Sequence, residues 1–412
     1  MKLNRLGSTL AIAMAASLVL TACGDDNPTA SDETTTEEEA ADDGAADDGA
    51  TDDAADDSAD ESAAGEGEDS TAETGGAGEG DAPAAELSGT LSGAGASSQD
   101  SAMAAWIAGY NQGQPGVTVN YDGVGSGGGR EQLVAGAVDF AGSDAYLDEE
   151  EATAAQEVCG PDGAMNIPVY ISPVAIPYNV PGVDTLNLTP SVLAQIFNQQ
   201  ITTWNDPAIA ADNPDADLPE ADITVVNRSD ESGTTENFME YLSAVAAEDW
   251  EHEADKVWPV AGGEAAQGTS GVIQVVGATE NAIGYADASA VGSLSTALIG
   301  VGDEFVEFSP EAAAKVVDAS EPAETGVEGD LALELARDTT ESGAYPIVLV
   351  SYHIVCSNYS NAAQGDMVKD FIGYVISEEG QAASAEAAGS APISEDLRTA
   401  ATESLDSITT GE

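Results

Sequence analysis

The chain has 412 residues, with 76 Asp and Glu side chains against nine Lys and Arg, and a formal net charge of −67 at pH 7. A surface of this sign repels nucleic-acid phosphates, which excludes nucleic acid as a partner. The length after an acidic N-terminal segment is enough for two domains.

The first 23 residues have the pattern of an export signal. Lys2 and Arg5 precede an apolar run from Leu10 to Leu20, which is too short to span a membrane. The run ends in Leu20-Thr21-Ala22-Cys23, which resembles a bacterial lipobox. We therefore expect residues 1–23 to be a lipoprotein signal peptide and Cys23 to carry the lipid, which would anchor the protein to the outer face of the cell membrane. An ordinary cleaved signal peptide is the alternative.

Residues 24–86 are predicted to form a disordered acidic linker. They contain 24 acidic side chains and no Lys or Arg, and the rest is mostly Ala, Gly, Thr and Ser. Such a composition cannot bury a core. We interpret the segment as a self-repelling stalk, or as a passive spacer.

Short β-like and helical runs alternate after the linker, which predicts an α/β fold. Two apolar runs, Asn166 to Tyr178 and Tyr345 to Val355, have the character of buried strands that cross between two lobes. We therefore expect one lobe split in sequence, 86–173 plus 346–412, and a second lobe over 174–345. The other expected strands are 90–91, 117–121, 138–141, 223–226 and 282–285, and the expected helices are 101–110, 131–135, a helix opening with a cap at Thr189-Pro190, 236–245, 271–276 and 367–376.

Two cysteines remain once Cys23 is assigned to the lipid. Because the protein is expected to be exported, Cys159 and Cys356 are predicted to form a disulfide, with two buried free thiols as the alternative. On the chain-entropy model a loop of this size contributes roughly 5 kcal/mol. His252, His353 and the four Trp residues are assigned to structural positions, because neither His belongs to a metal-like cluster.

The segment from Asn227 to Thr235 predicts an oxyanion site. Arg228, with a planar guanidinium, and the hydroxyls of Ser232 and Thr234 precede a helical run, and Gly233 lets the backbone approach a ligand closely. A helix N-terminus adds unpaired N–H groups and a partial positive charge, which favour an anion.

Three more Gly/Ser-rich turns follow β-like runs, at residues 93–98, 123–130 and 139–144. In an α/β sheet such turns gather at the carboxyl ends of the strands, where ligands bind. We expect Ser97 or Ser98 to cap the helix that follows the first turn. Arg130, after the second turn, is expected to be a solvent-facing residue of a first helical turn, with a residue at the lip of the site as the alternative.

These features together resemble the phosphate-binding proteins (PstS-like) of bacterial phosphate ABC transporters. The resemblance runs from about Leu87 to the C-terminal end and is most specific from Arg228 to Thr235; it includes 196–198, 201–205 and 282–285. It implies a type II periplasmic-binding-protein fold, in which two lobes joined by two hinge strands close on a dehydrated phosphate. It further implies delivery of the phosphate to a permease. We also expect no enzyme activity, no cofactor and a monomer.

The resemblance also assigns the ligand contacts. One departure is that many members resembling this chain carry Phe at the position of Ser98, where a backbone contact would survive. The phosphate-binding residues carried over are Ser97, Ser98 through its backbone, Ser126, Asp144, Arg228, Asp230, Ser232, Gly233 and Thr234.

The two aspartates need a reason for lying in an anion site. Phosphate near neutral pH keeps a proton that Asp144 can accept, whereas sulfate has none, so Asp144 would select phosphate. Asp230 is expected to orient Arg228. The alternative for both is an ordinary helix N-cap.

Two other classes of function stay open at this point. A phosphatase or Ser hydrolase would need a base beside a Ser motif or a set of metal ligands, and the sequence shows neither. The other class is a binder of another oxyanion, or a surface phosphate sensor that acts through a protein partner.

Overall fold

The computed structural model describes residues 87–411. The predicted signal peptide, the lipidation site Cys23 and the whole of the acidic linker, residues 24–86, lie outside these residues. Within residues 87–411, no helix is long and apolar enough to cross a membrane.

A six-stranded sheet organises the first half of the fold, in the order β10-β4-β16-β3-β1-β2. Strand β1 runs parallel to β2 and β3, whereas β16 is antiparallel to β3 and β4. This confirms the predicted α/β alternation. The strands are β1 (Gly89–Gly95), β2 (Val117–Asp122), β3 (Phe140–Ser143), β4 (Ala164–Ala175), β10 (Ala286–Asp287) and β16 (Val348–Cys356).

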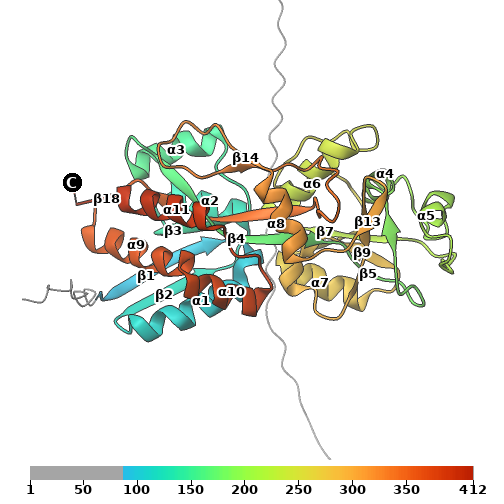
Figure 1. Ribbon diagram of the computed structural model, residues 1–412, viewed down its shortest axis with the longest axis horizontal. Coiled ribbons are helices and arrows are strands. Elements are labelled where there is room, and N and C mark those ends of the chain that lie inside the picture. The colour runs from blue at the N-terminus through green and yellow to red at the C-terminus, as the bar shows by residue number, and fades with distance from the viewer. Residues whose placement is uncertain (1–86, 412) are drawn as a thin grey trace, which may run out of the picture. The chain divides into compact units, whose positions relative to one another are not determined.

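The helices of this half form packed groups around the sheet (Figure 1). Helices α1, α9 and α10 contact one another, and Trp106 Nε1 of α1 donates a hydrogen bond to the Gly380 carbonyl of α10 at 2.8 Å. Helices α2 and α3 pack together, and α2 also contacts β1 and β3. The helices are α1 (Asp100–Gly113), α2 (Ser126–Val134), α3 (Glu149–Cys159), α9 (Ala362–Ile376), α10 (Glu378–Ala388) and α11 (Glu395–Ser407), with a 3₁₀ turn η1 (Ser97–Gln99) before α1.

A five-stranded sheet organises the second half, in the order β11-β5-β9-β7-β8, with a three-stranded sheet β13-β12-β6 beside it. Helix α7 packs on β5, β7, β8 and β9. The strands are β5 (Pro177–Asn179), β6 (Asn187–Leu188), β7 (Thr224–Arg228), β8 (Glu264–Ala266), β9 (Ala282–Gly284), β11 (Ser295–Thr296), β12 (Leu298–Val301) and β13 (Glu304–Val306); the helices are α4 (Pro190–Phe197), α5 (Pro207–Asp212), α6 (Gly233–Val245), α7 (Gly268–Ala278), η2 (Ala288–Ala290) and α8 (Pro310–Asp318).

Two short ladders complete the described elements. Strands β14 (Glu321–Pro322) and β15 (Leu333–Glu334) pair antiparallel, and β17 (Asn358–Tyr359) pairs parallel with β18 (Thr409–Thr410). The helix predicted to open at Thr189-Pro190 is confirmed, with Pro190 as the first residue of α4. Thr189 stands at the N-cap of α4, but its side chain makes no capping hydrogen bond.

The chain passes between the two sheets along long buried strands. All residues of β4 and β16 are buried, and the two strands pair side by side. Strand β4 continues after Ile176 into β5 of the other sheet, so the single strand predicted from Asn166 to Tyr178 is two strands. The short strand β10 pairs antiparallel with the end of β4, so it lies beside the strand along which the chain passes from one sheet to the other.

The disulfide predicted between Cys159 and Cys356 is confirmed. The two Cα atoms are 4.6 Å apart although 197 residues separate them in sequence. Cys159 ends α3 and Cys356 ends β16, so the bond ties a surface helix to the end of a buried strand. The buried positions predicted for Trp106, Trp204 and Trp250 are likewise confirmed.

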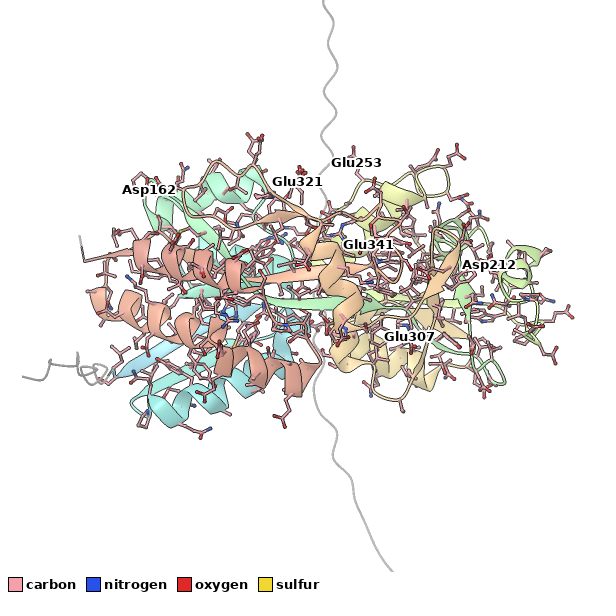
Figure 2. The ribbon with its side chains drawn as sticks, in the orientation of Figure 1. Asp162, Asp212, Glu253, Glu307, Glu321 and Glu341 are labelled. Carbon is pink, nitrogen blue, oxygen red and sulfur yellow. A yellow bond between two sulfur atoms is a disulfide. The ribbon has the colours of Figure 1, made fainter. Side chains whose placement is uncertain are left out.

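Negative and positive side chains occupy different places in the fold. Asp162, Glu253 and Glu341, which are labelled in Figure 2, are acidic and exposed. Arg130, Arg228 and Arg337 are buried, with 2%, 4% and 6% of their surface exposed. Three of the seven basic residues that follow the linker are therefore inside the protein.

Candidate functional site

The first loop of the site follows β1 and forms the turn η1. Ser97 Oγ accepts hydrogen bonds from Arg228 Nη2 and from the Thr269 N–H, both at 3.1 Å. Both donors belong to the second half, so this hydroxyl joins the two halves. The prediction that Ser97 or Ser98 caps α1 is wrong, because the η1 turn intervenes and Gln99 is the N-cap.

The second loop ends at Ser126, the first residue of α2. Gly125 precedes it with φ of +93°, a backbone conformation that favours glycine. A Cβ atom at Gly125 would lie 2.6 Å from Asp230 Oδ2 and from the Glu231 carbonyl oxygen. The second half therefore approaches this loop so closely that a side chain there would prevent the contact.

The loop around Arg228 leads into α6, which begins at Gly233, three residues before the predicted start. Ser232 is the N-cap, and its Oγ accepts from the Thr235 N–H at 3.1 Å. A Cβ at Gly233 would be 2.6 Å from Ser126 Oγ and 2.8 Å from Asp144 Cβ. The N-termini of α2 and α6, one from each half, thus meet at one point.

Backbone donors without acceptors gather at this point. No carbonyl or side chain within residues 87–411 accepts a hydrogen bond from the backbone N–H groups of Ser97, Ser98, Ser126, Gly233 and Thr234. Unpaired N–H groups of this kind are normal at helix N-termini, and several of them directed at one place are typical of anion sites.

Arg228 supplies the guanidinium of the site and is oriented by Asp230. Its Nε donates to Asp230 Oδ1 at 2.8 Å, and its Nη2 donates to Asp230 Oδ2 and to Ser97. Burial alone would raise the pKa of Asp230, but the hydrogen bond and charge of Arg228 hold it below its usual range. The hydrogen bonds of Arg228 within the described residues come from Nε and Nη2, so Nη1 remains able to donate to a ligand.

Asp230 also contacts the start of α7, because its Oδ1 accepts from the Gly268 N–H at 3.0 Å. It does not cap the helix of its own segment, since that N-cap is Ser232. The carboxylate therefore holds Arg228 and α7 in a fixed relation.

Asp144 lies at the centre of the contact between the halves and is 3% exposed. Its Oδ1 accepts from Ser98 Oγ and Ser351 Oγ, both at 2.6 Å, and its Oδ2 accepts from Thr234 Oγ1 at 2.9 Å. Asn237 Nδ2 donates to its carbonyl at 2.7 Å. Asp144 is followed by Ala145 in a turn and caps no helix, which removes the alternative of an N-cap aspartate.

The prediction that Arg130 faces solvent is wrong. Arg130 is 2% exposed, its Nε lies 2.8 Å from Glu151, and its Nη1 donates to Ser143 Oγ at 3.0 Å. Its Nη2 reaches Glu236 of α6 at 3.5 Å, in the other half. The sequence suggested an exposed first turn, but the acidic helices α3 and α6 pack against this side chain.

Two residues that contact the site were missed in the sequence. Thr269 follows Gly268 at the start of α7, and its Oγ1 lies 3.1 Å from Ser97 Oγ. The run Gln267 to Gly271 has the same Gly and hydroxyl pattern as the other loops and could have been recognised. Ser351 is in the middle of β16, and nothing in its apolar surroundings signals a polar role.

The structure brings all nine predicted ligand residues to one place through the contacts above. Among the described residues no group of three or more His, Cys, Asp or Glu is arranged to hold a metal ion. The arrangement can accept a small tetrahedral anion through N–H groups, hydroxyls and one guanidinium, with one carboxylate as acceptor.

The fold and this site define a protein of the PBP superfamily, whose domain profile matches residues 35–379. The chain is 35% identical over 379 residues to the phosphate-binding protein PstS 3 of Mycobacterium tuberculosis, with 90% of each chain covered. It is also 35% identical over 300 residues to the phosphate-binding protein PstS of Xylella fastidiosa, covering 71% of this chain and 78% of that one. The chain therefore belongs to the family of PstS phosphate-binding proteins.

Solved structures agree on the fold. A phosphate-binding protein from Stenotrophomonas maltophilia is 21% identical, with a TM-score of 0.61 and coverage of 77% of this chain and 94% of that one. A high-affinity periplasmic phosphate-binding protein solved with phosphate is 22% identical, with a TM-score of 0.63 over 75% of this chain and 92% of that one. The predicted type II periplasmic-binding-protein fold is thereby confirmed.

Proposed function

We propose that this chain captures inorganic phosphate between two lobes, 86–173 plus 346–412 and 174–345, and delivers it to the permease of an ABC importer. The observation that carries the proposal is that five buried residues with unpaired backbone N–H groups, Ser97, Ser98, Ser126, Gly233 and Thr234, are linked by close contacts to Arg228 and Asp144. Membership in the PstS family supports phosphate as the ligand. The protein is a binding protein and not an enzyme.

Each predicted contact has a place in this proposal. The N–H groups of Ser97, Ser98, Ser126, Gly233 and Thr234 and the guanidinium of Arg228 donate to phosphate oxygens. Asp230 orients Arg228, and Ser232 positions the start of α6. Asp144 accepts the proton that phosphate retains near neutral pH, and a sulfate would meet this carboxylate with like charge and no proton to offer.

The negative net charge does not prevent tight binding, because the donors act at hydrogen-bond distance. Charge-assisted hydrogen bonds contribute roughly 1.5 to 3 kcal/mol each. A micromolar dissociation constant needs about −8 kcal/mol. Several such bonds therefore suffice after the cost of dehydrating phosphate and bringing the lobes together.

The location of the protein follows from the N-terminal pattern. We propose that Cys23 is lipidated and holds the protein, as a monomer, at the outer face of the cell membrane, with residues 24–86 as a stalk. PstS relatives support an extracytoplasmic place, and the lipobox supports the anchor. Metabolic labelling with a palmitate analogue tests it: wild type should be labelled and Cys23→Ser should not.

Calorimetric titration of the full chain tests the ligand. We expect tight binding of phosphate, competition by arsenate, and no competition by sulfate or molybdate at similar concentrations. Tight sulfate binding, or no phosphate binding, would refute phosphate selection. Release of product from a chromogenic phosphate ester would instead favour an enzyme, and normal phosphate import after deletion of the gene would favour a sensor.

A further inference from the structure

Ser351 contacts Asp144 from a position outside the loops that form the anion site. It lies in the middle of the buried strand β16 and has no exposed surface. Its Oγ is 2.6 Å from Asp144 Oδ1, and its other possible acceptor, the Ser143 carbonyl oxygen, is farther away at 3.3 Å. The hydroxyl therefore directs its proton to the carboxylate.

Gln99 fixes the direction of the hydrogen bond between Ser351 and Asp144. Gln99 Nε2 donates to Ser351 Oγ at 2.7 Å and to the Tyr352 carbonyl at 3.3 Å. Because a carbonyl can only accept, the contact with Tyr352 fixes which end of the Gln99 amide carries the N–H groups. Ser351 Oγ must therefore accept from Gln99, and its own proton is left for Asp144.

His353 completes this buried chain of hydrogen bonds. Burial lowers the pKa of His353 to about 3, so the ring is neutral at ordinary pH. Its Nε2 lies 3.1 Å from Gln99 Oε1, and Gln99 Oε1 can only accept, so the ring proton is on Nε2. All donors along the chain His353, Gln99 and Ser351 therefore point toward Asp144.

Ser98 and Thr234 also donate hydroxyl hydrogen bonds to Asp144, but they lie in a different part of the fold from Ser351. Ser98 lies in the turn η1 and Thr234 in the first turn of α6, both next to the unpaired N–H groups of the anion site, whereas Ser351 is enclosed in the strand β16. With Ser351 on Oδ1, Asp144 stays an acceptor, and its Oδ2 is the oxygen that faces Thr234 and the other half.

We propose that Ser351 is a positioning residue for specificity: it holds Asp144 as a proton acceptor, so that the site selects tetrahedral anions that carry a proton over those that do not. The inference rests on the proposed phosphate binding and adds the residue that enforces the choice. Without Ser351, Asp144 Oδ1 loses the donor that β16 holds in place, and the carboxylate is free to turn its lone pairs away from the ligand's proton, so the discrimination weakens although the donors to the anion remain.

The test compares phosphate and sulfate affinities of the full chain by calorimetry in wild type, Ser351→Ala and Ser351→Thr. One hydrogen bond to a charged group corresponds to about a tenfold or larger effect. We expect Ser351→Ala to lower the ratio of phosphate to sulfate affinity by about tenfold or more. Ser351→Thr should restore the ratio, because threonine keeps the hydroxyl.

Ser172→Ala is the matched control. Ser172 is fully buried in β4, next to Leu349 of β16, and its hydroxyl contacts the Pro173 carbonyl at 3.4 Å and not Asp144. It should leave the ratio unchanged. An equal loss of affinity for both anions in Ser351→Ala, or an unchanged ratio, would overturn the proposal, because a purely structural role predicts either.

Two further outcomes are distinguishable. If wild type does not bind phosphate, the proposed function fails, and the specificity role fails with it; if wild type binds phosphate selectively and Ser351→Ala does too, only the specificity role fails. Should Ser351→Ala not fold, Gln99→Met frees the hydroxyl to turn toward Ser143. An unchanged ratio in that variant overturns the proposal equally.

Discussion

Two loops of this protein carry an arginine in a similar setting of Gly and Ser, residues 123–130 and 227–235, yet the two arginines are used differently. Arg228 is held by Asp230 through two of its nitrogens and keeps Nη1 for a ligand. Arg130 is surrounded by Glu151, Glu236 and Ser143, and its contacts are with these side chains and the Ala145 carbonyl. One arginine is part of the anion site and the other joins acidic helices.

The difference lies in what packs around each guanidinium and not in the loop itself. Arg228 faces Ser97 across the contact between halves, whereas Arg130 lies between α3 and α6, whose first turns are acidic. Burial raises the pKa of Glu236 to about 7, against the lowering effect of Arg130.

The largest effect is expected from Arg228→Met. The variant removes charge-assisted hydrogen bonds to the anion and leaves Asp230 facing it without a counter-charge. We expect phosphate affinity to fall by at least about a thousandfold, since each such bond is worth roughly 1.5 to 3 kcal/mol. Calorimetry measures this, with Arg130→Met as the matched control. Near-native affinity in Arg228→Met would contradict the site.

Arg130→Met should affect stability more than binding. Removing one partner of a buried ion pair costs about 3 to 5 kcal/mol, and because Glu151 and Glu236 keep some exposure we expect about 2 to 3 kcal/mol here. Phosphate affinity should stay within about tenfold of wild type. Urea unfolding measures the stability.

The control for Arg130→Met is Arg398→Met, whose partner Glu378 is 90% exposed. Such a surface pair contributes about 1 kcal/mol or less. If Arg130→Met were as stable as this control, or bound phosphate as poorly as Arg228→Met, the contrast between the two loops would be wrong.

A buried carboxylate without an arginine sharpens the contrast. Burial raises the pKa of Asp287 from 3.8 to about 6, although hydrogen bonds from Ser289 lower it. Its Oδ2 has no hydrogen-bond partner among the described residues. Asp230, with Arg228 beside it, shows the opposite direction.

The pH dependence follows from this shift. Well below pH 3.8, Asp287 is protonated in both the folded and the unfolded protein. As the pH rises from 3.8 to about 6, the unfolded protein loses this proton while the folded protein keeps it, so the stability of the fold decreases. The penalty is complete above pH 6 and amounts to about 2 to 3 kcal/mol at 1.36 kcal/mol per pKa unit. Asp287→Asn should therefore gain stability relative to wild type between pH 4 and pH 7, measured by thermal unfolding. A difference that does not change with pH would contradict the assignment.

Local patterns of the sequence were enough to predict many parts of the fold. The apolar runs predicted the two buried passages between the sheets, because continuous apolar sequence fits a strand covered on both faces. Export predicted the disulfide between Cys159 and Cys356. Repeated Gly and hydroxyl residues after strands predicted which loops would meet, because the carboxyl ends of parallel strands share an edge.

Local details of the same loops were less accessible. The sequence did not predict the turn η1 that precedes α1, the start of α6 at Gly233, or the break between β4 and β5 at Ile176. Each of these details is a shift of one to three residues, which local sequence patterns do not resolve. The sequence missed Thr269 although its loop has a readable pattern. It could not indicate Ser351, because a Ser in an apolar strand usually has no more than a local partner.

The sequence by itself determined the fold class, the extreme charge and the residues able to bind an anion, since these depend on composition, periodicity and the chemistry of short motifs. Only the tertiary structure decided which of the two loop arginines faces the anion site, and which buried groups surround Asp144. The physical reason is that the role of a charged or polar side chain depends on partners more than a hundred residues away, and folding alone brings those partners within hydrogen-bond distance.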